Sequence, residues 1–230
     1  MELATLFNHN RSMFFDTDDQ GRVSFRGKYL AEFEESTYSS RIVGMSLSGF
    51  KGKDLTGLAD VFPLIKRLTI EKTSNIKSLN GIEKFTNLEE LRIEECGKLT
   101  DLSAVSGLTC LKEINLEKFN SAVPFIQYIT KLPLNSLWIS GNLTDLHLLI
   151  EILTLESLNL NGSDCQQSEL PILPKVQTSL GIDGFPNLIS AAFLQNQDVS
   201  VRIRWWGPKT ISSVPAHLLE HDGLKEVSKT

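Results

Sequence analysis

The stretch LEELRIEEC, residues 88–96, contains the pattern that determines the fold. It surrounds three apolar residues with four glutamates and one arginine. Successive side chains of a β-strand point to opposite faces of a sheet. A strand here would send Leu91 and Ile93 to a core, and Arg92 with the flanking glutamates to the opposite face. The sequence therefore predicts a strand with one buried face and one highly charged face.

The same pattern recurs along the chain at a nearly constant interval. The segments RLTI, ELRI, EINL and SLWI begin their apolar alternation 23 residues apart, at Leu68, Leu91, Ile114 and Leu137. The frame extends back by 23 residues and forward by steps of 21, 22 and 21, to Met45, Leu158, Leu180 and Val201. A fixed period of this length is the signature of a repeat architecture. We therefore predict eight repeats in one frame.

The segments between the strands have a different apolar spacing. It is about three residues, as in Leu99, Leu102, Val105 and Leu108. This spacing favours a 3₁₀-like return segment over a second strand. Each repeat is thus predicted to be one strand followed by one irregular or 3₁₀ return.

The L-x-x-L-x-L frame of residues 42–206 resembles the leucine-rich repeat family, in its short internalin-like class. The resemblance implies an α/β solenoid: a curved horseshoe with a parallel β-sheet on the concave face and mostly 3₁₀ or irregular segments on the convex side. The position that usually holds Asn in this family reads Phe50, Thr73, Cys96, Phe119, Asn142, Ser163, Phe185 and Trp206. We therefore expect an interior that mixes a short polar ladder with aromatic rings.

Stacked repeats share one core and need covers at both ends. We predict one structural domain, with an N-terminal cap over residues 1–41, eight repeats of 21–23 residues over 42–206, and a C-terminal cap and tail over 207–230.

In the first cap, DTDDQGRVSFRG begins like a calcium loop at Asp16. It has Gly27 where that loop needs a bidentate Glu. A polar turn between two strands is therefore expected there.

Composition narrows the classes of partner. The net charge of -5 argues against binding to nucleic acid or anionic membranes, because both depend on an excess of Lys and Arg. Three cysteines with no C-x-x-C pair indicate reduced thiols, and no basic head followed by an apolar run marks a secretory signal. We expect a cytoplasmic monomer that needs no cofactor.

The segment HLLEH, residues 217–221, matches the H-x-x-E-H pattern in which two helical histidines hold zinc. Only nine residues follow it, so no downstream helix supplies a third protein ligand. Elsewhere the sequence contains no recognisable combination of nucleophile, general base and oxyanion-hole donors that would predict a catalytic site. We predict no catalytic residues, no metal site and no enzyme activity. A metal-dependent hydrolase or zinc-binding protein that uses HLLEH is the alternative.

The outward residues of the concave face form the predicted binding site. Trp138 lies between Asn115 and Asn159 in its column, and an aromatic residue among polar neighbours is typical of binding sites. The acidic columns favour a partner with a basic surface, although Arg67 and Arg92 could neutralise them and leave an ordinary solvated surface. We predict a protein–protein interaction module, either a neutralising, immunity-type protein or an adaptor. The predicted partner-binding residues are Arg67, Glu71, Glu90, Arg92, Glu94, Glu113, Asn115, Glu117, Trp138, Asn159, Arg202, Arg204 and Trp205.

Overall fold

A computed structural model gives the fold, and it describes residues 12–17, 21–26, 41–119, 124–141, 143–224 and 228–229. The chain forms two compact units, Met1–Val123 and Pro124–Thr230. Each unit is described by itself.

The first unit contains a sheet whose strands follow the order β6-β5-β4-β3-β1-β2. Its strands are β1 (Ser12–Thr17), β2 (Gly21–Arg26), β3 (Ile42–Ser48), β4 (Arg67–Glu71), β5 (Glu90–Glu94) and β6 (Glu113–Glu117). Strands β3 to β6 are parallel, whereas β1 pairs antiparallel with both β2 and β3. The return segments include α3 (Leu58–Val61), η3 (Ile82–Lys84) and η4 (Ser103–Gly107).

The second unit contains four parallel strands in the order β10-β9-β8-β7. These strands are β7 (Ser136–Ser140), β8 (Ser157–Asn161), β9 (Ser179–Asp183) and β10 (Arg202–Trp206). Two further short strands, β11 (Thr210–Ile211) and β12 (Ser228–Lys229), pair with each other. The 3₁₀ segments are η5 (Ile126–Tyr128), η6 (Leu146–Glu151), η7 (Ala192–Leu194), η8 (Ala216–Leu218) and η9 (Asp222–Leu224).

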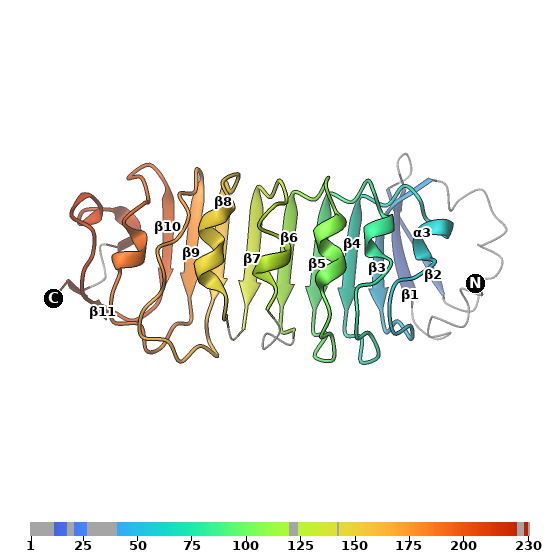
Figure 1. The fold of residues 1–230 in the computed structure, drawn as a ribbon, viewed down its shortest axis with the longest axis horizontal. Helices are drawn as coiled ribbons and strands as arrows, with labels where there is room; N and C mark the ends of the chain where they lie inside the picture. Colours follow the sequence, from blue (N-terminus) through green and yellow to red (C-terminus); the bar gives the residue numbers. More distant parts are fainter. Residues whose placement is uncertain are drawn as a thin grey trace. The chain divides into compact units, whose positions relative to one another are not determined.

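In each unit the parallel strands form one layer, and the helical segments lie on one side of that layer (Figure 1). The leucine-rich repeat solenoid predicted from the sequence is therefore confirmed, with its parallel strands and mostly 3₁₀ returns. No helix among the described residues is long and apolar enough to cross a lipid bilayer.

The antiparallel pairing of β1 with β2 confirms the two strands expected around the polar segment after Asp16. Residues 18–20, between these strands, lie outside the described residues, as does Gly27. The division into two caps and eight repeats within one domain stays a prediction.

The core is built by the residues that the repeat frame selects. Leu91 and Ile93 are buried, and so are the matching pairs of β3, β4 and β6 to β9. At the ladder position, the Thr73 hydroxyl lies 3.3 Å from the Cys96 thiol, and both residues are buried. Burial raises the pKa of the Cys96 thiol, so it remains protonated and packs as a small apolar group.

The ladder prediction is wrong in the sixth repeat. Ser163 is exposed, and Cys165 takes the buried position instead. The Leu143 N–H donates to the Cys165 sulfur at 3.2 Å, and that sulfur lies 3.4 Å from the Gly141 carbonyl oxygen. The turn after β8 is two residues longer than the frame allowed. Asn142, the one Asn at this position, lies outside the described residues.

The register predicted for the eighth repeat is also wrong, by two residues. Leu180 of β9 pairs with Ile203 of β10, not with Val201. The cause is that Val201 is buried as well, in the turn that precedes the strand. Apolar alternation alone could therefore not distinguish Val201 from Ile203, the first inward residue of β10.

Candidate functional site

The outward side chains of the parallel strands form a surface that we call the strand face. In the first unit, pairing between β4, β5 and β6 aligns three rows across the sheet. The rows are Arg67–Glu90–Glu113, Thr69–Arg92–Asn115 and Glu71–Glu94–Glu117. The predicted acidic rows are thus brought together, with five glutamates and two arginines on three neighbouring strands.

Arg92 neutralises part of this acidic surface. Its guanidinium lies 3.4 Å from the Glu117 carboxylate and 3.7 Å from the Glu94 carboxylate. The arginine side chain is half exposed, so each contact contributes little to stability. Its Nη2 therefore reaches one carboxylate on its own strand and one on the neighbouring strand. In the same row, the side-chain oxygen of Asn115 is buried with no hydrogen-bond partner among the described residues.

The charges at the strand edges form separate ion pairs. Glu89 lies 3.0 Å from the Lys112 ammonium group and 3.6 Å from that of Lys66. The hydrogen bond and charge of Lys112 are the main reason that the pKa of Glu89 is lowered. Glu95 pairs in the same way with Lys118, at 3.1 Å. These edge residues therefore belong to lateral ladders between repeats rather than to the strand face.

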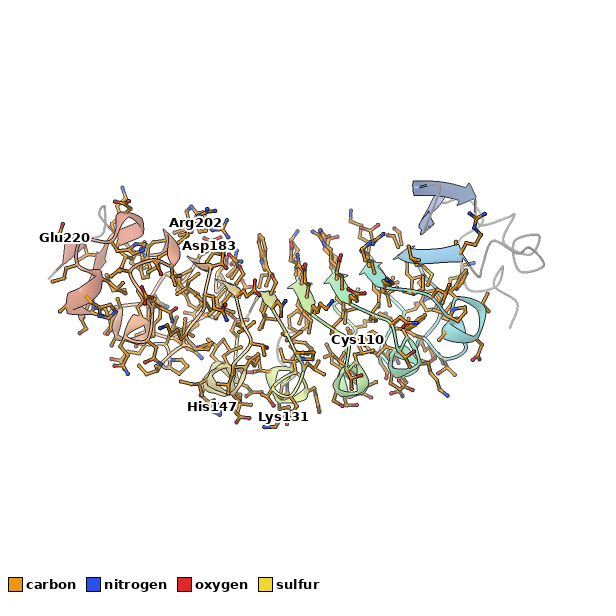
Figure 2. The ribbon with its side chains drawn as sticks, turned by 90° about the horizontal axis from the view of Figure 1, so that it is seen from above. Cys110, Lys131, His147, Asp183, Arg202 and Glu220 are labelled. Atoms are coloured by element: carbon orange, nitrogen blue, oxygen red, sulfur yellow. The ribbon has the colours of Figure 1, made fainter. Side chains whose placement is uncertain are left out.

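In the second unit the register places two rows of outward residues side by side. One row is Trp138–Asn159–Gly181–Arg204, and the other is Ser140–Asn161–Asp183–Trp206. Trp138 and Trp206 are 43% and 57% exposed, unusually high for the largest apolar side chain. Figure 2 shows the labelled Asp183 and Arg202 on the strand side of this unit, and His147 and Lys131 on its helical side.

These rows enclose a pocket of about 210 Å³, which we call the tryptophan pocket. Its lining residues are Trp138, Asn159, Leu160, Asn161, Gly181, Asp183, Arg204 and Trp206. They come from β7, β8, β9 and β10, which are all within the second unit.

Hydrogen bonds hold the polar walls of the tryptophan pocket in place. Nη2 of Arg204 donates to Oδ1 of Asn159 at 2.9 Å, and the guanidinium carbon lies 5.6 Å from the centre of the Trp206 ring. Nδ2 of Asn161 donates to Oδ2 of Asp183 at 3.1 Å. Because these groups are already oriented, a guest would lose little free energy in ordering them.

Gly181 makes the pocket possible. It stands between Asn159 and Arg204 in its row. A Cβ atom at this position would overlap Oδ1 of Asn159. Glycine therefore lets the arginine side chain reach across one whole strand, and it leaves the floor of the pocket open.

The sequence-predicted site differs from the observed one at its C-terminal end. Strand β10 continues through Trp206, so the alternation of the strand turns Trp205 away from the strand face. The Trp205 ring is half-buried and stacks on Phe193 at 6.3 Å between ring centres. Its indole N–H donates to the Pro208 carbonyl at 3.1 Å. Trp206 takes the outward position instead, whereas Arg202 and Arg204 are outward as predicted.

Five pocket residues were missing from the predicted site: Leu160, Asn161, Gly181, Asp183 and Trp206. The segment RIRWW contained the signal for Trp206. Treating Ile203 and Trp205 as the inward pair would have placed Trp206 outward, next to Asp183. The open floor at Gly181 depends on a missing side chain, so no pattern of residue types would have identified it.

The two histidines of HLLEH bond to backbone groups of the preceding repeat. Nε2 of His217 donates to the Gln197 carbonyl at 2.8 Å. In His221, Nδ1 accepts the Gly223 N–H at 3.0 Å, so Nε2 holds the proton and donates to the Val201 carbonyl at 2.7 Å. Within the part of the chain that the structure describes, no group of three or more potential metal ligands is present.

Parallel strands repeated every 21–23 residues, with 3₁₀ returns on the opposite side, define a leucine-rich repeat protein. Residues 59–179, just over half of the chain, match the family described as the Endo-beta-N-acetylglucosaminidase EndoS LRR domain. The chain belongs to this leucine-rich repeat family. A comparison with curated proteins finds no match.

Proposed function

We propose that this chain is a non-enzymatic module that binds a protein partner through its strand face. The observation that supports this most strongly is the tryptophan pocket, where two exposed indole rings flank polar groups that are already fixed by hydrogen bonds. The residues that dominate binding energy in protein interfaces are enriched in tryptophan and cluster in well-packed pockets.

The charge of the strand face suggests the character of the partner. The row Glu71–Glu94–Glu117 and the flanking Glu90 and Glu113 outnumber the arginines on the same strands. A partner with a basic surface would be steered towards these glutamates. We propose a neutralising, immunity-type protein or an adaptor, acting as a cytoplasmic monomer without a cofactor and binding neither nucleic acid nor membrane.

Affinity capture from the native lysate tests this proposal. The wild-type chain and the variants Trp138→Ala and Glu94→Lys would be used as baits, with Leu153→Ala as the control. Leu153 is 84% exposed and follows the 3₁₀ segment η6. We expect Trp138→Ala to weaken capture by about 2 kcal/mol or more, Glu94→Lys to weaken it mainly at low salt, and Leu153→Ala to retain the partner. Equal retention by all four baits would contradict binding through the strand face.

The matched family is named after the repeat domain of an enzyme, an endo-β-N-acetylglucosaminidase. A metal-dependent hydrolase that uses HLLEH was the alternative interpretation of the sequence. No observation favours it, because the Nε2 atoms of His217 and His221 both face carbonyl oxygens. Stoichiometric zinc in the purified protein, lost in His217→Ala, would support the alternative instead.

A further inference from the structure

The tryptophan pocket has the size of one side chain. Its volume of about 210 Å³ lies below the range of about 300–1,000 Å³ that is typical of sites for drug-sized ligands. Trp138 and Trp206 supply aromatic surface to its walls, and Gly181 leaves its floor open. A single flat ring fits these walls, because aromatic rings favour stacked or edge-to-face contact.

The charges in the pocket favour a neutral guest. Within the described residues, Arg204 has no carboxylate and Asp183 has no cation within ion-pair distance. A cationic guest would face the guanidinium of Arg204, and an anionic guest would face the carboxylate of Asp183. Either guest would meet a like charge in a partly desolvated site, and a neutral ring avoids both costs.

The remaining hydrogen-bonding groups favour a guest with a hydroxyl. Oδ2 of Asp183 accepts from Asn161, and its other oxygen accepts no hydrogen bond from the described part of the chain. Oδ1 of Asn159 is bonded to Arg204, which leaves the Asn159 amide N–H groups as donors. A hydroxyl donates one hydrogen bond and accepts others, so one such group could satisfy the free oxygen of Asp183 and the amide of Asn159 together.

We propose that the tryptophan pocket receives the phenol ring of a tyrosine side chain that projects from the partner protein. This inference rests on the proposed function and specifies the partner's contact chemistry. The ring packs against Trp138, while the hydroxyl donates to Asp183 and accepts from Asn159. Tyrosine is enriched in protein interfaces because it combines a large apolar ring with a polar tip.

The test uses N-acetyl-tyrosinamide and N-acetyl-phenylalaninamide as probes of the intact chain, by ligand-observed NMR and by fluorescence of the tryptophans. We expect the tyrosine probe to bind with a dissociation constant on the order of 1–10 mM, about fivefold tighter than the phenylalanine probe. Trp138→Ala should abolish binding of both probes. Asp183→Ala should bring the two affinities within about twofold of each other. The matched control is Asp164→Ala, at an exposed aspartate that does not line the pocket, and it should keep the fivefold preference.

Three results would overturn the proposal: tighter binding of a methyl hexoside or of n-butylammonium than of the tyrosine probe, an unchanged tyrosine preference in Asp183→Ala, or no binding of any probe at about 20 mM. A methyl hexoside preference would indicate a sugar subsite, and an n-butylammonium preference would indicate a site for lysine. The proposed function is tested separately. If Trp138→Ala still loses the captured partner, protein binding stands while the tyrosine assignment fails.

Discussion

A positive φ angle recurs at the residue that follows six of the eight parallel strands, β3 to β7 and β9. Positive φ angles occur there at Gly49, Lys72, Glu95, Lys118, Gly141 and Gly184. The N–H of Lys72 donates to the Glu94 carbonyl of the next strand at 3.0 Å, and Glu95 bonds to Glu117 in the same way. This left-handed turn therefore extends the hydrogen bonding between neighbouring repeats one residue beyond the strands. Glycine adopts it readily, whereas the lysines and the glutamate pay a steric cost of about 1–2 kcal/mol each.

Replacing Lys72 by glycine should therefore stabilise the protein. Lys72 has a φ of 50° and an exposed side chain. Glycine removes the steric cost of the left-handed conformation, but it also gives the unfolded chain more conformational entropy. The first free-energy change should exceed the second, so the free energy of unfolding should rise by about 0.5 kcal/mol. Urea denaturation measures this. Lys98→Gly is the control, because Lys98 is exposed but has no positive φ, and it should lose stability. If both variants lose stability equally, the strain argument fails.

At the scale of elements, short polar turns connect the strands to the return segments. In the turn before η4, Oδ1 of Asp101 accepts from the N–H and the hydroxyl of Ser103, at 3.0 and 2.7 Å. Oδ2 of the same residue accepts from the Ser78 hydroxyl of the preceding repeat at 3.2 Å. The N–H of Ser200 donates to Asp198 in the same manner, at 3.0 Å. Asp101 thus satisfies a local backbone N–H, much as an N-terminal cap does, and it also links two repeats through Ser78.

Asp101 should make the stability of the fold depend on pH. Its pKa is lowered, chiefly by the hydrogen bonds from Ser103. The carboxylate therefore stabilises the fold at pH values above the unfolded pKa of about 3.9, and this contribution disappears as the pH falls through the lower folded pKa.

We expect Asp101→Ala to lower the free energy of unfolding by about 0.5–1 kcal/mol at pH 7, at the low end of capping values because solvent screens the site. The difference from wild type should shrink below about pH 4. Chemical denaturation at several pH values measures it. Glu169→Ala is the control, since Glu169 is exposed and forms no hydrogen bond with described residues, and it should change little. If Asp101→Ala lowers the free energy of unfolding equally at pH 3 and pH 7, the lost stability comes from packing and not from the carboxylate charge.

The strands could be predicted from the sequence wherever they follow the alternation of apolar and polar residues. Alternation around Leu91 and Ile93 predicted the correct inward residues and rows for β3 to β6 in the first unit and for β7 to β9 in the second, because the same apolar pair recurs at matching positions of these strands. The rule failed where turns change length. Before β10, the extra apolar residue Val201 led to a wrong prediction of the strand register. After β8, a longer turn places Cys165, not Ser163, at the ladder position. The tryptophan pocket depends on that same register, so its outline could not be predicted in full.

At the scale of the whole molecule, stability arises mainly from contacts between neighbouring repeats. The last repeat of the second unit therefore needs a cover for β10, and the segment after it is the predicted C-terminal cap. η9 packs against β10, and Leu218 and Leu224 are fully buried. The imidazoles of His217 and His221 donate to the Gln197 and Val201 carbonyls. In a longer array, a ninth repeat would bond to these carbonyl groups. The described part of the chain contains no ninth repeat, and the two histidines bond to the carbonyls instead.

Removing one of these imidazoles should loosen the second unit from its C-terminal end. His221→Ala leaves the buried Val201 carbonyl and the Gly223 N–H without their partner, at a local cost of about 1–3 kcal/mol. Because repeats are coupled mainly to their neighbours, hydrogen exchange should accelerate most in β10, less in β9 and β8, and least in β7. Hydrogen–deuterium exchange with mass spectrometry measures this gradient.

His147→Ala is the matched control, since His147 is exposed on the helical side of the same unit (Figure 2), and it should leave exchange unchanged. Uniform acceleration across all four strands would mean that the unit opens as one cooperative block rather than from its C-terminal cover.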